Sequence, residues 1–296
     1  MLHVVHHPDY VVSTSGGAHQ FSKYGVVMEI LRAGAMVEHR PQPMPIRWLN
    51  AGHDPDYVEA VVSATVSPEI ERRIGFAVTK EVARRAVLSP GGTWLAAKLA
   101  LQHGYAANAA GGSHHASYDS GAGYCVFNDL AVATLRVLGE GDAERIMIVD
   151  LDVHQGDGTA TMLAARDDVA TLSVHAEKNF PVRKAISTLD VPLPDGTGDN
   201  AYLAALVPAF DGLIDRFRPD LILYQAGVDV HIDDKLGRLA LTDQGIGARD
   251  AFIAQRARSL GIPLASTMGG GYGNDVRAVA ARHAATMRTL AAVHFG

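Results

Sequence analysis

Ten residues that begin at Asp150 combine carboxylates with a histidine. They read Asp-Leu-Asp-Val-His-Gln-Gly-Asp-Gly-Thr and follow the apolar run at 146–149. In an extended chain the side chains of Asp150, Asp152 and His154 point to the same side, because successive residues alternate between faces. Two carboxylates and an imidazole that converge are suited to a divalent metal. Taken alone, the segment could equally be a solvated loop after a core strand.

Three further polar segments also follow apolar, strand-like runs. They are Gly111-Gly112-Ser113-His114-His115 after 105–110, Gln225-Ala226-Gly227-Val228-Asp229 after 221–224, and Gly269-Gly270-Gly271-Tyr272 after 263–268. Singly, the paired histidines could be incidental, and the triple glycine lacks the Lys-Ser/Thr or G-x-G-x-x-G spacing of phosphate loops. Together, four polar segments at strand ends are the arrangement expected of an active site in an open α/β sheet.

The composition favours a soluble globular protein with a sizeable core and argues against several other classes. Of 296 residues, 48% are hydrophobic and 20% charged, and the net charge is −6 without a run of Lys or Arg. We therefore expect no nucleic-acid partner, and no membrane span, because no apolar stretch approaches about 18 residues. Cys125 is the single cysteine, which excludes an intramolecular disulfide and a cysteine-based zinc site. No secretory signal is visible, which predicts a cytoplasmic protein. The oligomeric state is left open.

The pattern of elements predicts one α/β domain over residues 1–296. Helices are expected at 128–138, at 201–217 with Pro208 disturbing it, at 242–260 with Thr242 as N-cap and Gly261 past its end, and at 276–293. A further strand is expected at 169–174, surface loops at 41–45 and 52–55, and partly helical structure at 72–87. Alternating strands and helices predict a mainly parallel central sheet with helices on both faces.

A resemblance to a known family rests on these segments together with Gly-Tyr-Cys-Val-Phe-Asn-Asp at 123–129. In order and spacing over about residues 88–275, they resemble the zinc-dependent histone deacetylase superfamily, which has the arginase/deacetylase fold. Arg183-Lys184 and Leu-Pro-Asp-Gly-Thr-Gly-Asp at 193–199 look most like class IV and its compact bacterial relatives. The motifs are specific for the superfamily and less so for substrate, because acetylpolyamine amidohydrolases share most of the site and arginases share the fold.

The resemblance implies a metal-dependent amide hydrolase that removes an acyl group from lysine or a related primary amine, such as a polyamine. Asp152, His154 and Asp229 match the metal ligands. Zinc is expected, with Fe²⁺ or Mn²⁺ as alternatives, because two carboxylates and one imidazole form a fairly hard set. A structural potassium ion is also implied. The positions that match its site are Asp150, Asp152, His154, Ser173 and Val174.

The same resemblance assigns the catalytic side chains. His114 and His115 match the tandem histidines that act on the water and on the leaving nitrogen, with Asp150 orienting the former and Asp157 the latter. We expect His115 to be the general base and His114 to act mainly through its charge, although the sequence does not separate these roles. Tyr272 matches the tyrosine whose hydroxyl stabilises the oxyanion.

The expected substrate channel has one backbone acceptor and apolar walls. By resemblance, the carbonyl of Gly123 receives the substrate amide N–H, while Tyr124 and Phe180 form opposite walls. Leu236 lines the pocket, and Gly270 lets the backbone approach it. Such an apolar tube suits the stem of an acylated lysine or polyamine. Plain core packing is the alternative reading for the two aromatic residues.

One departure bears on the substrate. Several histone-directed members carry a rim aspartate about forty residues before the tandem histidines, whereas this chain has Arg-Arg-Ile-Gly-Phe-Ala at 72–77. The departure puts clamping of a peptide backbone in doubt. Alternative functions are an acetylpolyamine amidohydrolase, an arginase-like ureohydrolase, or an acyl-lysine binding protein without catalysis. The complete set of polar motifs argues against the last two.

Overall fold

A parallel β-sheet runs through the centre of the protein. The computed structural model describes residues 1–14 and 21–296, and within them eight strands, all paired in parallel, follow the order β2-β1-β3-β8-β7-β4-β5-β6. Their bounds are β1 Leu2–Val5, β2 Met36–His39, β3 Tyr105–Asn108, β4 Ile146–Asp150, β5 Val169–Ala176, β6 Leu189–Leu193, β7 Leu221–Gln225 and β8 Leu264–Thr267.

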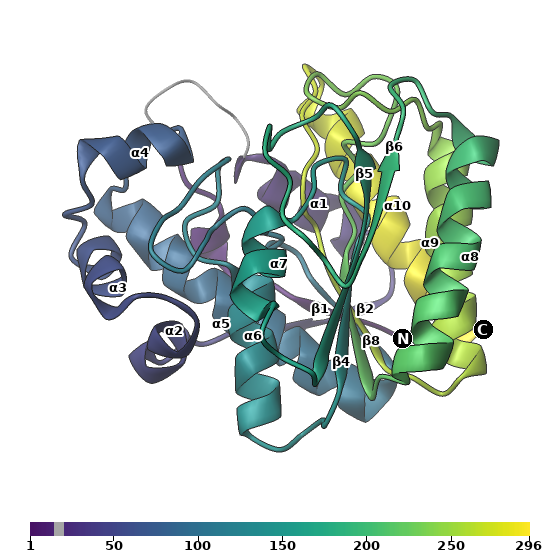
Figure 1. The fold of residues 1–296 in the computed structure, drawn as a ribbon, viewed down its shortest axis with the longest axis horizontal. Helices are drawn as coiled ribbons and strands as arrows, with labels where there is room; N and C mark the ends of the chain where they lie inside the picture. The colour runs from purple at the N-terminus through teal and green to yellow at the C-terminus, as the bar shows by residue number, and fades with distance from the viewer. Residues whose placement is uncertain (15–20) are drawn as a thin grey trace.

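Helices cover both faces of the sheet, with α5, α6 and α7 on one side and α8, α9 and α10 on the other (Figure 1). Every residue of β3, β4, β7 and β8 is buried, as expected of parallel strands covered on both faces. The α/β prediction is confirmed. The bounds are η1 Pro8–Tyr10, α1 Lys23–Arg32, α2 Ile46–Gly52, α3 Pro55–Val62, α4 Pro68–Ile74, α5 Lys80–His103, α6 Asp129–Gly139, α7 Asp157–Leu163, α8 Asp199–Phe217, α9 Asp243–Ser259 and α10 Val276–Phe295.

The later helices agree with the sequence because their end signals are local. Asn128 caps α6 by accepting a hydrogen bond from the amide of Ala131 (2.9 Å). Thr242 caps α9 in the predicted way, through the amide of Gly245 (3.1 Å). Pro208 lies inside α8, which continues unbroken to its end. Among the described residues, no helix is both long and apolar enough to cross a bilayer.

The first hundred residues depart from prediction. The prediction of a surface loop at 52–55 is wrong. Gly52 is buried at the end of α2, and Pro55 is the first residue of α3, with Asp54 as its N-cap. Gly, Asp and Pro are common in turns, but Asp followed by Pro is also typical of a helix start, where Asp is the N-cap and Pro the first helical residue. Segment 41–45 is irregular as expected, but Met44 is buried. The partly helical stretch 72–87 contains the end of α4 and the start of α5, separated by Gly75 with φ +97°.

The order of the strands brings the four polar segments together. They follow β3, β8, β7 and β4, which are consecutive neighbours in the middle of the sheet. The last residues of these strands are also level, because Asp150 pairs with Gln225, and Thr267 pairs with both Gln225 and Asn108. Side chains from four distant segments therefore meet at one sheet edge, the expected position of a site in an α/β protein.

Candidate active site

Asp152, His154 and Asp229 form a compact buried group. The first two follow β4, and Asp229 follows the adjacent β7. His154 Nδ1 lies 3.1 Å from Asp152 Oδ1 and 3.2 Å from Asp229 Oδ2. A metal site needs at least three His, Cys, Asp or Glu side chains close together. Within the described part of the chain, this is the one such group whose possible ligand atoms all lie within 4.8 Å of one another.

The donor set fits a divalent cation. Both carboxylates hold backbone amides: Asp229 Oδ1 accepts from the amide of Val153 (2.9 Å), and Asp152 accepts from the amide of Gly270 at Oδ2 (2.7 Å) and from that of His154 at Oδ1 (3.0 Å). Asp229 Oδ2 is buried and accepts no hydrogen bond of good geometry among the described residues, although His154 Nδ1 lies 3.2 Å away. Burial alone would lower the pKa of His154, but contact with the two carboxylates raises it to about 10. The group therefore favours positive charge where its ligand atoms meet.

Gly270 lies behind the carboxylates. A Cβ at this position would lie 1.9 Å from Asp229 Oδ2, so no larger residue fits without displacing that side chain. Gly270 therefore permits a close approach of backbone to the Asp152–His154–Asp229 group, and its own amide holds Asp152. The structure places Gly270 in the lining of the cavity beside these residues.

The tandem histidines project from the loop after β3, each beside one carboxylate. His114 Nδ1 lies 2.7 Å from Asp150 Oδ2, and His115 Nδ1 lies 2.7 Å from Asp157 Oδ1. Asp129, the first residue of α6, anchors the loop by accepting hydrogen bonds from the amides of residues 112 and 113 (3.1 and 2.7 Å). Hydrogen bonding at Nδ1 directs Nε2 of each ring toward the interior of the site, where Nε2 of His114 lies 3.8 Å from Asp152 Oδ1.

The two histidines differ in their electrostatics. Burial by itself lowers the pKa of His114, but Asp150 and Asp152 outweigh it and raise this pKa to about 9. Burial and the nearby charge of His114 lower the pKa of His115 to about 4, because a single carboxylate, Asp157, offsets them incompletely. The pair therefore consists of one imidazole that holds a proton and one that is neutral near pH 7.

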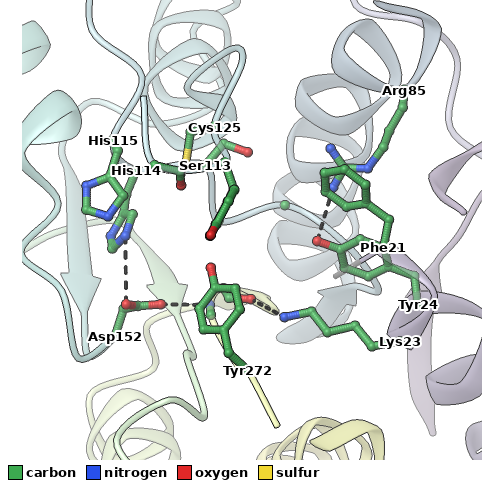
Figure 2. Close-up of a pocket in the computed structure, with 16 residues that line it drawn as sticks. Phe21, Lys23, Tyr24, Arg85, Ser113, His114, His115, Cys125, Asp152 and Tyr272 are labelled. Carbon is green, nitrogen blue, oxygen red and sulfur yellow. Dashed lines mark hydrogen bonds and ion pairs between the residues drawn. The ribbon is translucent and has the colours of Figure 1, made fainter. Parts of the chain in front are cut away.

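Tyr272 faces the histidines across the site. Its ring centroid lies 6.5 Å from that of His154 and 5.8 Å from that of Tyr124. Its amide donates to Asp234 Oδ2 (2.6 Å). The ammonium of Lys23 lies 5.4 Å from the ring centroid on the other side and donates to the carbonyl of Gly269 (3.0 Å). Figure 2 shows the ring between Asp152 and Lys23, with both histidines above Asp152 in this view.

A cavity of about 40 Å³ lies among these groups. Gly123 and Tyr124 border it, both with left-handed backbone (φ +52° and +67°). A Cβ on Gly123 would lie 2.7 Å from Cδ2 of His115, which leaves no space there for a side chain. The carbonyl of Gly123 contacts Sγ of Cys125 at 3.4 Å. The cavity is also lined by Phe21, Lys23, Tyr24, Arg85, Gly111, Gly112, Ser113, His114, His115, Cys125, Asp152, Gly269, Gly270 and Tyr272.

The two remaining channel residues lie outside the lining of this cavity. Phe180 is 45% exposed and meets the ring of His115 edge-on at a centroid distance of 4.8 Å. Leu236 is 42% exposed, and its carbonyl accepts a hydrogen bond from Asn179 (2.6 Å). Both side chains therefore belong to an outer rim, whereas the half-buried Tyr124 lines the cavity itself.

The residues matched to a monovalent cation also come together. Ser173 of β5 is the direct register partner of Asp150 on β4, and Val174 follows it in the same buried strand. The hydroxyl of Ser173 contacts His175 Nδ1 at 3.0 Å. This places the two β5 residues beside the strand that leads to Asp152 and His154.

Several residues that organise the site are absent from the sequence prediction. Arg249, buried in α9, donates to the carbonyls of Leu151 (3.1 Å) and Gly227 (2.8 Å), in the segments that lead to Asp152 and Asp229. Asn179 and Asp234 hold loops around the site through side-chain hydrogen bonds. Burial lowers the pKa of Lys23 to about 8. Only Asp234, five residues after Asp229, lies near a predicted motif.

Comparison with known structures identifies the fold. The crystal structure of the HDA15 HD domain superimposes with a TM-score of 0.83, covering 98% of this chain and 87% of that one, at 22% sequence identity. At this identity the likeness shows the shared fold. It is the arrangement of parallel strands and flanking helices described above.

Sequence comparison identifies the family. The histone deacetylase domain family model matches residues 18–289. The chain is 41% identical to an uncharacterised protein of Picosynechococcus sp. (98% of this chain, 99% of that one). It is 31% identical to histone deacetylase 2 of Arabidopsis thaliana (91% and 74%) and 32% identical to a probable deacetylase of Methanothermobacter thermautotrophicus (72% and 66%).

The protein therefore belongs to the histone deacetylase domain family. Family and relatives indicate a deacetylase, which is a hydrolase. The family acts on acylated amines and is generally metal-dependent, in agreement with the buried Asp-His-Asp group.

Proposed function

We propose that the protein is a metal-dependent deacylase that hydrolyses an acylated side-chain amine of lysine or a related primary amine. The observation that carries the proposal is the convergence of Asp152, His154 and Asp229 with a buried carboxylate oxygen that accepts no hydrogen bond of good geometry, directly beside two histidine–carboxylate pairs. Zn²⁺ is the proposed ion, with Fe²⁺ or Mn²⁺ as substitutes. When bound, the ion supplies a Lewis acid for the carbonyl and makes water a stronger nucleophile near neutral pH.

The chain's own residues supply the proton transfers. His115 accepts the proton of the attacking water and delivers it to the leaving nitrogen, and Asp157 holds its ring in the required tautomer. His114, paired with the more deeply buried Asp150, contributes positive charge (side-chain exposure of Asp150 is 5%, against 26% for Asp157). The different surroundings of the two pairs support this division.

The remaining roles concern the carbonyl and the acyl chain. Tyr272, which lines the cavity opposite the histidines, donates its hydroxyl to the developing oxyanion. The carbonyl of Gly123 accepts the substrate N–H. Tyr124, Phe180 and Leu236 contact the apolar part of the substrate. We also propose that the loop after β4, with Ser173 and Val174, holds a structural potassium ion.

The experiment is a matrix of metals and substrates. Protein stripped with a chelator is reloaded with Zn²⁺, Fe²⁺ or Mn²⁺ and assayed on lysine and polyamine carriers with acyl chains of increasing length, and on free arginine. Metal-dependent release of acid from an acyl-amine supports the proposal, and the preferred carrier separates lysine from polyamine. Urea from arginine would instead establish a ureohydrolase. Stoichiometric metal with binding but no turnover would indicate an acyl-lysine binding protein.

A further inference from the structure

Asn179 is a buried polar residue at the outer part of the site. It has no role in the proposed reaction. It follows β5 and is 7% exposed, whereas its neighbours Lys178 and Phe180 are exposed. A buried amide side chain needs partners for one oxygen and two N–H groups. The groups near it belong to two different parts of the site, the loop at 234–238 and His154.

The side chain joins two loops. Asn179 Oδ1 accepts from the amide of Arg238 (2.9 Å), and Nδ2 donates to the carbonyl of Leu236 (2.6 Å). A backbone amide can only donate and a carbonyl can only accept, so these partners define a single orientation of the amide. Asn179 therefore attaches its own loop, residues 177–188, to the loop at 234–238.

The same side chain reaches a metal-ligand residue. Asn179 Nδ2 lies 3.4 Å from His154 Nε2, on the side of the ring opposite Nδ1. This is a packing contact and not a hydrogen bond, because both nitrogens carry protons when His154 Nδ1 faces a cation or the histidine is protonated. The backbone is held as well, because the ammonium of Lys184 donates to the carbonyls of Asn179 (2.5 Å) and Pro181 (2.7 Å). The segment around Phe180 is therefore held by the side chain of Asn179 and by the contacts of Lys184 with its backbone, and it lies against His154.

The loops joined by Asn179 carry the two exposed apolar residues of the rim. Phe180 is the next residue in the chain and contacts the ring of His115, and Leu236 provides the carbonyl that Asn179 binds. If this connection is lost, the two loops keep only their separate anchors: Asp234 holds the amide of Leu236 (2.8 Å), and Lys184 holds the backbone beside Phe180. The amide of Asn179 joins one loop directly to the other, so it contributes to the separation of Phe180 and Leu236 and hence to the space for an acyl chain.

We infer that Asn179 is a positioning residue that sets the spacing of the rim walls Phe180 and Leu236 relative to His154, and so determines the affinity for longer apolar acyl chains. The inference rests on the proposed function for its substrate. The proposed role of Asn179 is not metal binding, because the hydrogen bonds of its side chain go to backbone atoms of Leu236 and Arg238.

The test compares Asn179→Ala with Lys178→Ala, an exposed neighbour in the same loop. With zinc-loaded protein, we expect the dissociation constant of octanohydroxamate to rise on the order of tenfold in Asn179→Ala, which is about 1.4 kcal/mol. Acetohydroxamate, too short to reach the rim, should bind as in the wild type, and metal content should stay stoichiometric. Lys178→Ala should change neither. Equal weakening of both hydroxamates, or loss of metal, would overturn the inference.

Hydrogen exchange provides a readout that is independent of turnover. In Asn179→Ala the Arg238 amide loses its acceptor, so its exchange should accelerate on the order of tenfold or more, together with amides at 177–188. Asn179→Asp, which is isosteric, keeps an acceptor for that amide but replaces the donor to Leu236, so the Arg238 amide should stay protected while octanohydroxamate binds more weakly. Unchanged exchange in Asn179→Ala would refute the positioning role. Failure of the wild type to hydrolyse any acyl-amine would refute only the proposed function.

Discussion

Two regions of the site are held in different ways: the floor, which comprises Asp152, His154 and Asp229 with His114, His115 and Tyr272, and the rim, which comprises Phe180 and Leu236. On the floor, Asp152 and Asp229 each bind a backbone amide, and Arg249 holds two carbonyls beside them. On the rim, Phe180 and Leu236 are nearly half exposed and are connected through one side chain, Asn179. The many connections of the floor make its geometry resistant to single changes, whereas the rim can vary with little effect on it. We infer that reaction chemistry lies in the floor and acyl selectivity in the rim.

The largest effect is expected on the floor, at Asp229. Asp229→Asn keeps an oxygen for the amide of Val153 but removes the charge of the ligand, so it should lose both bound metal and measurable turnover while remaining folded. Elemental analysis of the purified variant decides the matter, with Asp233→Asn, at a site 73% exposed in the same loop, as control. Stoichiometric metal in Asp229→Asn would contradict the ligand role.

A second test divides the floor between its two histidines. His115→Ala should lower kcat on the order of 10²–10⁴-fold, the usual contribution of a general base, and His114→Ala should lower it less, because His114 acts through its charge. Wild-type kcat/KM should follow a bell-shaped pH profile whose limbs report the coupled site. Steady-state rates across pH, with metal content measured alongside, check this. Mild and equal losses in the two variants would refute the assignment.

Tyr272 offers a narrower change within the floor. Tyr272→Phe keeps the ring between Asp152 and Lys23 and removes only the hydroxyl, so fold, metal and hydroxamate binding should persist. Turnover should fall by about 10²–10³-fold, the typical effect of losing one oxyanion donor. The comparison is kcat on an acetyl-lysine reporter against the dissociation constant of acetohydroxamate. If kcat is unchanged, Tyr272 only forms part of the wall.

The same contrast explains which features could be predicted from sequence. Asp152, His154 and Asp229 follow buried strands, and strand ends in a parallel sheet meet at one edge, so their convergence follows from local pattern and topology. The helix caps Asn128 and Thr242 are equally local. These signals lie within a few residues of the feature that they predict.

Other features depend on contacts between distant segments. Asn179 lies in an irregular loop, and its partners at 236–238 are almost sixty residues away. Lys23 reaches the site from the other end of the chain. Strands β1 and β2 have four residues each, too few for a clear periodic pattern. In the loop expected at 52–55, Asp54 and Pro55 have turn-like identities but serve as a helix cap and first helical residue.

The smallest effect is expected at the rim, from Leu236→Ala. A long acyl chain would cover only the exposed part of this side chain, so the lost apolar contact is about 1 kcal/mol, less than the full burial of a leucine. We expect KM for an octanoyl-lysine substrate to rise about fivefold, with kcat unchanged and acetyl-lysine kinetics as in the wild type. Leu260→Ala, at a similarly exposed position that caps α9, is the matched control. A drop in kcat for acetyl-lysine would show that the rim also positions the reacting groups, and the proposed separation between chemistry and selectivity would then fail.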